Sequence, residues 1–234
     1  MRLRSDFAGR ALGAALVAIT ISMALVACER PEPGPAAKPI HQSRAKSQFD
    51  AAALEASVDA AMAWRDSVGM SATTLTPPSR EEVVAAFDGL GFEINDELQI
   101  LWSMGATTEG GPGLFDGFEL LTAAASRSRY DVLRADASLA WRPNWVPVLA
   151  SNDAWIAVEC SRSTAPAGPV VVFRAGEEPV IAFTNLTHFF ETVASALDQA
   201  THANGRVDVP RSVFEEAHGA SNPGLPLPDH LTEN

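Results

Sequence analysis

The residues of this chain that could do chemistry are a few spaced carboxylates, five histidines and two cysteines. Two carboxylate pairs, Asp116 with Glu119 and Asp153 with Glu159, are of the residue type that general acid–base catalysis uses. No pattern shows that either pair converges, and solvated acids are the usual state of surface loops. The serine motif at residues 219–223 has Pro223 where a nucleophile elbow requires glycine. These residues predict a protein without enzymatic activity.

The histidines do not suggest a metal or cofactor site. Residues His41, His202, His218 and His230 lie in segments expected to be a tether or a tail, and His188 lies on the side of a helix expected to be exposed. No phosphate-binding loop, no His-Glu-x-x-His motif and no zinc-type spacing occurs. We therefore predict neither a metal nor a cofactor.

Cys28 has the most specific surroundings in the chain. Three arginines precede an apolar run, Ala11–Val26, of roughly 16 residues, which is short for a bilayer of about 30 Å and has the length of a signal-peptide core. The string Leu25-Val26-Ala27-Cys28 resembles the lipobox of bacterial lipoproteins. The resemblance implies cleavage before Cys28, a diacylglycerol thioether on its sulfur and an acylated N-terminus, which form a stable membrane anchor. The alternative is an ordinary secretory signal or an uncleaved anchor helix.

The chain is strongly acidic, with 29 acidic and 17 basic residues and a net charge of −12; loss of residues 1–27 would leave 28 and 14. This charge argues against a nucleic-acid partner, because phosphates require a basic footprint. It also argues against electrostatic docking on anionic lipid. A basic protein partner is compatible with it through long-range attraction, although many soluble domains are acidic without such a role.

Composition divides the chain into four parts. Residues 1–27 are the expected signal peptide, residues 28–48 a Pro/Ala-rich tether, residues 49–200 the folded domain and residues 201–234 a loosely ordered tail. With Cys28 acylated, Cys160 has no disulfide partner and is expected to be an inert buried thiol.

Hydrophobic periodicity within residues 49–200 predicts helices first, then strands, then a helix. Ser79 with Glu82 forms a capping box, and Asn95 and Asn185 are further expected helix starts. This order predicts an α+β fold: an antiparallel-rich mixed sheet with helices against one face. The expected helices are 49–68, 80–90, 96–104, 122–133 and 186–197, and the expected strands are 118–121, 145–149, 154–160, 169–173 and 180–183.

Five strings, in order, resemble the SUKH superfamily, most closely its Smi/Knr branch, over about residues 49–199. They are Thr76–Val83, Leu90–Leu98, the glycine loop and strand Gly113–Leu121, the Trp-x-Pro-x-Trp-Val-Pro-Val string Trp141–Val148, and the last strands and helix at 170–173 and 182–190. The chain departs from the family pattern at Asn95, at Met104-Gly105 and in the acidic turn, where Ser151-Asn152-Asp153-Ala154 stands. The resemblance implies a single SUKH-like domain.

Bacterial members of this superfamily are mostly immunity proteins that bind and block toxins, and others are scaffolds in cell-wall or signalling complexes. The resemblance implies a membrane-anchored protein-binding module in the cell envelope that neutralises a toxin, or alternatively a regulator of cell-wall assembly. Glu29 is not the aspartate that marks inner-membrane retention in Gram-negative bacteria, so we expect the outer membrane, facing the periplasm.

Loops and an acidic strand face are what such a domain can offer a basic toxin. Trp145 alternates with Val146 and Val148 and is expected in the core, whereas Trp155 shares a strand face with Glu159 and is either core or interface. The expected partner-binding residues are Glu109, Asp116, Asn152, Asp153, Trp155 and Glu159.

Overall fold

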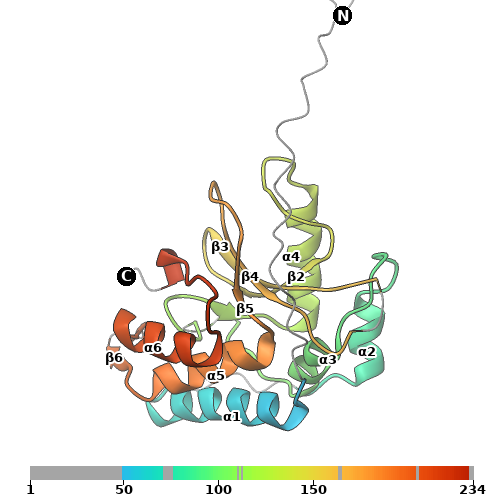
Figure 1. Ribbon diagram of the computed structural model, residues 1–234. Helices are drawn as coiled ribbons and strands as arrows, with labels where there is room; N and C mark the ends of the chain where they lie inside the picture. Colours follow the sequence, from blue (N-terminus) through green and yellow to red (C-terminus); the bar gives the residue numbers. More distant parts are fainter. Residues whose placement is uncertain are drawn as a thin grey trace, which may run out of the picture. The chain divides into compact units, whose positions relative to one another are not determined.

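Helices and strands follow one another in the order that the periodicity predicts. The computed structural model describes residues 49–70, 76–109, 111, 113–162, 165–203 and 206–231, all within the compact unit Arg44–Asn234 (Figure 1). The α+β class is confirmed. The described helices are α1 (Ala51–Ser67), α2 (Arg80–Ala86), α3 (Asp96–Ser103), α4 (Ala123–Ala135), α5 (Leu186–Leu197) and α6 (Arg211–Ser221), with a 3₁₀ turn, η1, at Asp229–Leu231.

The strands form a meander in which each pairs with its neighbours in sequence. The five-stranded sheet has the order β1-β2-β3-β4-β5, and a hairpin of β6 and β7 stands apart from it. Each pairing of the described strands is antiparallel, so the expectation of a mixed sheet is corrected in this respect. The strands are β1 (Glu119–Leu120), β2 (Trp145–Ala150), β3 (Ala154–Glu159), β4 (Val170–Arg174), β5 (Val180–Phe183), β6 (Thr201–Ala203) and β7 (Arg206–Asp208).

The predicted helix starts are confirmed in atomic detail. Ser79 accepts a hydrogen bond from the N–H of Glu82, whose carboxylate accepts one from the N–H of Ser79. The side chains of Asn95 and Asn185 accept from the backbone three residues on. Each such cap satisfies an amide that the helix cannot, which stabilises it by about 1 kcal/mol.

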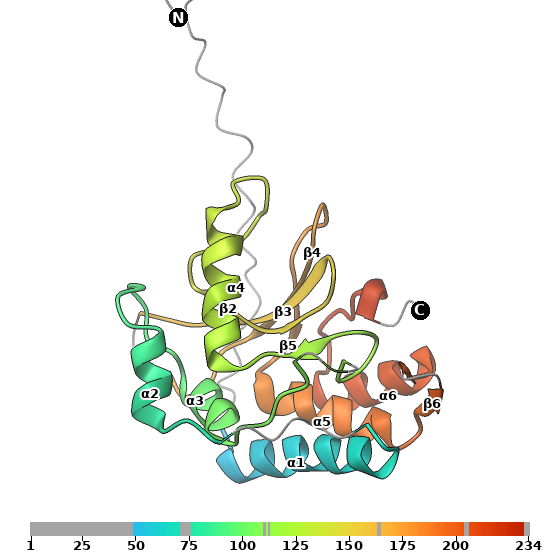
Figure 2. The same cartoon turned by 180° about the vertical axis from the view of Figure 1, so that it is seen from behind.

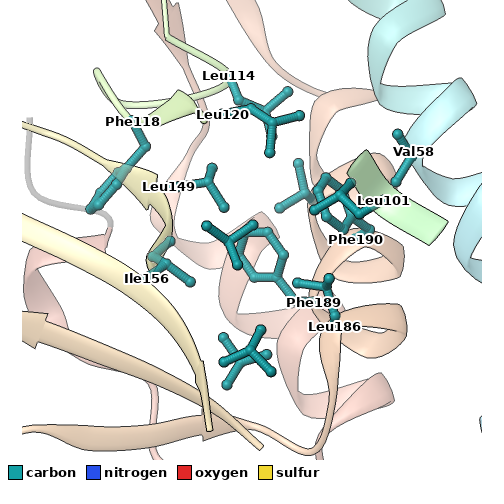
Figure 3. Packing of buried hydrophobic residues seen from close by; sticks show 14 of the residues in the cluster. Val58, Leu101, Leu114, Phe118, Leu120, Leu149, Ile156, Leu186, Phe189 and Phe190 are labelled. Carbon is teal, nitrogen blue, oxygen red and sulfur yellow. The ribbon is translucent and has the colours of Figure 1, made fainter. Parts of the chain in front are cut away.

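The main core lies between one face of the sheet and the helices α1, α3 and α5. Figure 3 shows Ile156 and Leu149 from the sheet facing Phe189 and Leu186 of α5 across this core. Trp145 is buried as expected, but on the opposite face.

The opposite face of the sheet is also covered, which corrects the expectation of helices on one face. Leu133 of α4 packs with Trp155 and Phe173, and Ser126 of α4 donates a hydrogen bond to the carbonyl of Pro147. Figure 2 shows α4 beside the sheet, away from α1 and α5. All six residues of β2 are consequently buried.

Residues 201–203 and 206–231 form helices, strands and turns rather than the loosely ordered tail that was expected. They form β6, β7, α6 and η1, and α6 packs along α5 (Figure 1). Phe214 of α6 and Leu231 of η1 are completely buried in the main core. The polar, proline-rich composition of this C-terminal segment gave no indication of these buried apolar side chains.

Candidate functional site

Antiparallel pairing brings the sheet's turns and their acids to one end. Register pairs Glu119 with Ala150 and Ala154 with Arg174, so the start of β1, the β2–β3 turn and the β4–β5 turn lie side by side. Figure 1 shows both hairpin turns projecting at the same end of the sheet. We call this region the acidic sheet end; its carboxylates are those of Glu119, Asp153, Glu177 and Glu178.

Arg174 organises the acidic sheet end. Its Nε lies 3.0 Å from an oxygen of Asp153, and its guanidinium lies 3.8 Å from Glu177. The second oxygen of Glu177 lies 3.0 Å from Nδ1 of His230 in η1. The four carboxylates outnumber the one arginine, and Asp153, Glu177 and Glu178 are exposed. A negative surface therefore faces solvent across neighbouring strands spaced by about 4.8 Å.

Two of the predicted partner-binding residues lie in the acidic sheet end with exposed side chains. Asn152 and Asp153 form the β2–β3 turn. Glu109 is exposed outside β1, where its carboxylate accepts a 3.2 Å hydrogen bond from the hydroxyl of Thr122, the N-cap of α4.

The other three predicted residues are not available there. Both carboxylate oxygens of Asp116 are buried within the tight turn before β1. Trp155 is only 7 % exposed and stacks on Phe173 with centroids 5.5 Å apart, so its core interpretation is correct. Glu159 ends β3 and lies near the indole N–H of Trp145, about 20 Å from Asp153 along the strand.

The two candidate catalytic pairs fail for different reasons. Asp153 and Glu159 lie at opposite ends of β3, and the oxygens of Asp116 are buried. Neither pair brings two accessible carboxylates to one reacting centre, as acid–base catalysis requires.

Sequence reasoning named Glu119 only as a possible catalytic carboxylate, and it missed Glu177 and Glu178. The turn at Ala175–Glu178 is recognisable in the sequence, and its position two strands away from the β2–β3 turn follows from a meander. Pairing the predicted strands in sequence order, residue by residue, would have placed Glu177 and Glu178 beside Asp153.

Other buried polar groups serve the fold. Glu97 of α3 is fully buried, and its carboxylate accepts hydrogen bonds from the N–H groups of Leu186 and Thr187 and from the Thr187 hydroxyl, at 3.2, 3.0 and 2.8 Å. It thereby satisfies the first amides of α5. Burial raises the pKa of Glu97, and these hydrogen bonds oppose the rise.

Cys160 is buried, as predicted, and burial raises the pKa of its thiol to about 12. A thiol that stays protonated is a poor nucleophile. Cys28 lies outside the described residues. A shallow, open depression of about 370 Å³ lies between α2 and α3.

A comparison with models of protein families found no match, and no curated protein was found to be similar in sequence. None of the described helices has both the length and the apolar composition needed to cross a membrane.

Proposed function

We propose that this chain is a lipid-anchored, non-enzymatic protein-binding module whose acidic sheet end binds a basic protein. The convergence of Glu119, Asp153, Glu177 and Glu178 on neighbouring turns carries the proposal. Complementary charge of this kind steers a basic partner and speeds its association. The partner that we propose is a toxin, which makes the protein an immunity protein facing the periplasm.

Two features support this proposal beyond charge. The α+β architecture, with helices preceding an antiparallel meander, is compatible with the SUKH-like order of motifs. The Leu25-Val26-Ala27-Cys28 string supports an anchor that holds the module in the envelope, where an incoming toxin would meet it. The alternative proposal is a scaffold or regulator of cell-wall assembly, which the same resemblance favours.

The experiment is complementation of a deletion strain in co-culture with toxin-delivering sibling cells. The strain receives the wild-type chain, Glu178→Lys at the acidic sheet end or Glu55→Lys on α1. Both glutamates are exposed, so the two substitutions change the net charge equally at different places. We expect the wild type and Glu55→Lys to protect the cells and Glu178→Lys to protect them poorly.

The outcomes separate the two functions. If Glu55→Lys and Glu178→Lys weakened protection equally, the result would contradict a role for the acidic sheet end. Unchanged survival of the deletion strain in co-culture, together with an envelope defect in monoculture, would favour the scaffold and overturn the immunity proposal.

A further inference from the structure

A histidine from the C-terminal segment lies beside the acidic sheet end. Nδ1 of His230 is 3.0 Å from one carboxylate oxygen of Glu177, and the histidine side chain is only 7 % exposed. The other oxygen of Glu177 faces the guanidinium of Arg174 at 3.8 Å. The Glu177 carboxylate therefore lies between an arginine, which is always charged, and a histidine, whose charge depends on pH.

The 3₁₀ turn η1 holds this imidazole in place from both sides. Leu231 is completely buried in the main core, and Pro228 is buried as well. Asp229 accepts a hydrogen bond from Arg211 of α6. Because the neighbours of His230 fix η1 independently of the imidazole, the ring lies beside Glu177 whether or not it is protonated.

Charged groups lie on two sides of the imidazole. They are Glu177, Glu178 and Arg174 on the side of the sheet, and Asp229, Arg211 and Glu215 on the side of η1 and α6. Those on the second side are paired with one another, since Arg211 contacts both Asp229 and Glu215. The carboxylate that a protonated His230 would neutralise is thus that of Glu177.

The two charge states of His230 give the acidic sheet end different charges. A neutral imidazole with its proton on Nδ1 donates to Glu177 and leaves the carboxylate charge in place. A protonated imidazole adds a positive charge 3.0 Å from that carboxylate. The four carboxylates of the acidic sheet end less the one of Arg174 give a charge of −3, and the protonated imidazole reduces it to −2.

We infer that His230 regulates the acidic sheet end, which binds a basic partner tightly when the imidazole is neutral and more weakly when the imidazole is protonated. Histidine ordinarily changes its charge between about pH 5 and about pH 8, whereas carboxylates and arginines ordinarily keep theirs over this range. The inference rests on the proposed function, because it concerns the same binding surface.

The experiment measures the affinity of the processed chain, residues 28–234 with Cys28→Ser, for a fluorescent oligolysine peptide. This chain keeps each residue that the structure describes. The affinity is measured at about pH 7.5 and at about pH 5.5, between which lysine keeps its charge. The wild type should bind about fivefold more weakly at the lower pH, which is the effect of one unit charge at contact distance in water.

His230→Gln should abolish this pH dependence. Glutamine takes up no proton in this range, so the variant should bind at both pH values as tightly as the wild type does at the higher one. His202→Gln is the matched control, because it removes an imidazole from the β6–β7 hairpin, apart from the five-stranded sheet. It should keep the fivefold change.

A second pair of variants tests the same contact from the exposed turn. Glu177→Gln should bind at both pH values as weakly as the wild type does at the lower one. The carboxylate that His230 neutralises is then absent, and a protonated imidazole would be buried with neither N–H partnered, since Nε2 is buried without a partner among the described residues. Glu178→Gln, one residue on, should weaken binding at both pH values and keep the change. Circular dichroism would verify that all variants are folded, and this pair decides the matter if His230→Gln is not.

A wild-type affinity that does not fall at the lower pH would overturn the inference, as would a pH dependence that persists in His230→Gln or in Glu177→Gln. If Glu178→Gln still weakened binding at the higher pH, the acidic sheet end would remain the binding surface and the proposed function would stand. If neither glutamate variant weakened binding there, both the inference and the proposed role of the acidic sheet end would be contradicted.

Discussion

At the scale of single residues, the most consequential side chain is one that the sequence did not single out. Glu97 places a carboxylate in the protein interior, where it joins α3 to the first turn of α5 across 89 residues of sequence. Its oxygens accept hydrogen bonds from donors that would otherwise be buried without partners. Each buried donor left without a partner would cost about 1–3 kcal/mol of stability. The carboxylate is therefore a structural element of the core.

Glu97→Gln should reduce stability at low pH, because it keeps the size of the side chain but removes the proton that the folded chain holds more tightly than the unfolded chain does. Burial raises the folded-state pKa of Glu97 above its unfolded value, so the folded chain holds this proton more tightly. The stabilisation that this proton linkage provides is complete below about pH 4 and is lost as the pH rises through the folded-state pKa. The free energy of unfolding of wild type minus variant, measured in urea, should thus shrink as the pH rises. A difference that grows with pH would contradict this direction.

The two cysteines should differ completely in acylation. Cys28→Ser should abolish labelling by a radioactive fatty acid and release the protein from membranes, because it removes the acceptor sulfur of the lipobox. Cys160→Ala is the matched control and should leave labelling unchanged, since its thiol is buried with its pKa raised to about 12. Membrane fractionation and the processed mass test this. A Cys28→Ser chain that keeps both its processed mass and its membrane association would refute the lipobox.

At the scale of elements, both edges of the five-stranded sheet are covered by hydrogen-bonding side chains. At β1, Thr107 donates to the carbonyl of Leu120, and Thr108 accepts from the N–H of the same residue. At β5, a ring nitrogen of His218 lies 2.7 Å from the carbonyl of Ala182, and Asn222 accepts from the N–H of Thr184. Covered edges cannot pair with strands of other chains.

Asn222→Ala should destabilise the protein by about 1–3 kcal/mol, because it leaves the Thr184 N–H at the β5 edge without its acceptor. Urea unfolding measures the loss, and light scattering would detect association through the uncovered edge. Ser221→Ala, one residue earlier in α6, is the control and should change stability by no more than about 0.5 kcal/mol. Equal effects of the two substitutions would show that the β5 edge does not depend on Asn222.

At the scale of the whole molecule, the C-terminal segment is part of the folded unit. Phe214 of α6 and Leu231 of η1 are buried in the main core. The contact of His230 with Glu177 links η1 to the β4–β5 turn. The acidic sheet end therefore depends on residues far along the chain for its local order.

Truncation after Val209 should abolish cooperative unfolding or lower the midpoint markedly, because it removes α6 and η1 from the core. Phe214→Ala alone should cost about 3–5 kcal/mol. Thermal unfolding followed by circular dichroism measures both, and truncation after Leu231 is the control that keeps each described residue. If truncation after Val209 left the midpoint unchanged, the segment would be the loose tail that its composition suggests.

The sequence by itself determined the elements whose signals are local. Ser79, Asn95 and Asn185 begin helices because each side chain caps its own first turn. Short apolar or alternating runs between turn residues predicted the five strands, because such signals are readable over a few residues. The core position of Trp145 followed from the same alternation.

Tertiary structure decided what depends on residues far apart in the chain. The burial of Trp155 follows from α4 and Phe173, which alternation along β3 cannot reveal. The segment 206–231 is held in place by a few apolar residues, such as Phe214 and Leu231, that enter a core built by other elements. The average composition of the segment does not reveal these contacts. The acidic sheet end exists because the strand register sets Asp153 beside Glu177 and Glu178. Glu159 is excluded from it because it lies six positions after Asp153, at the other end of β3.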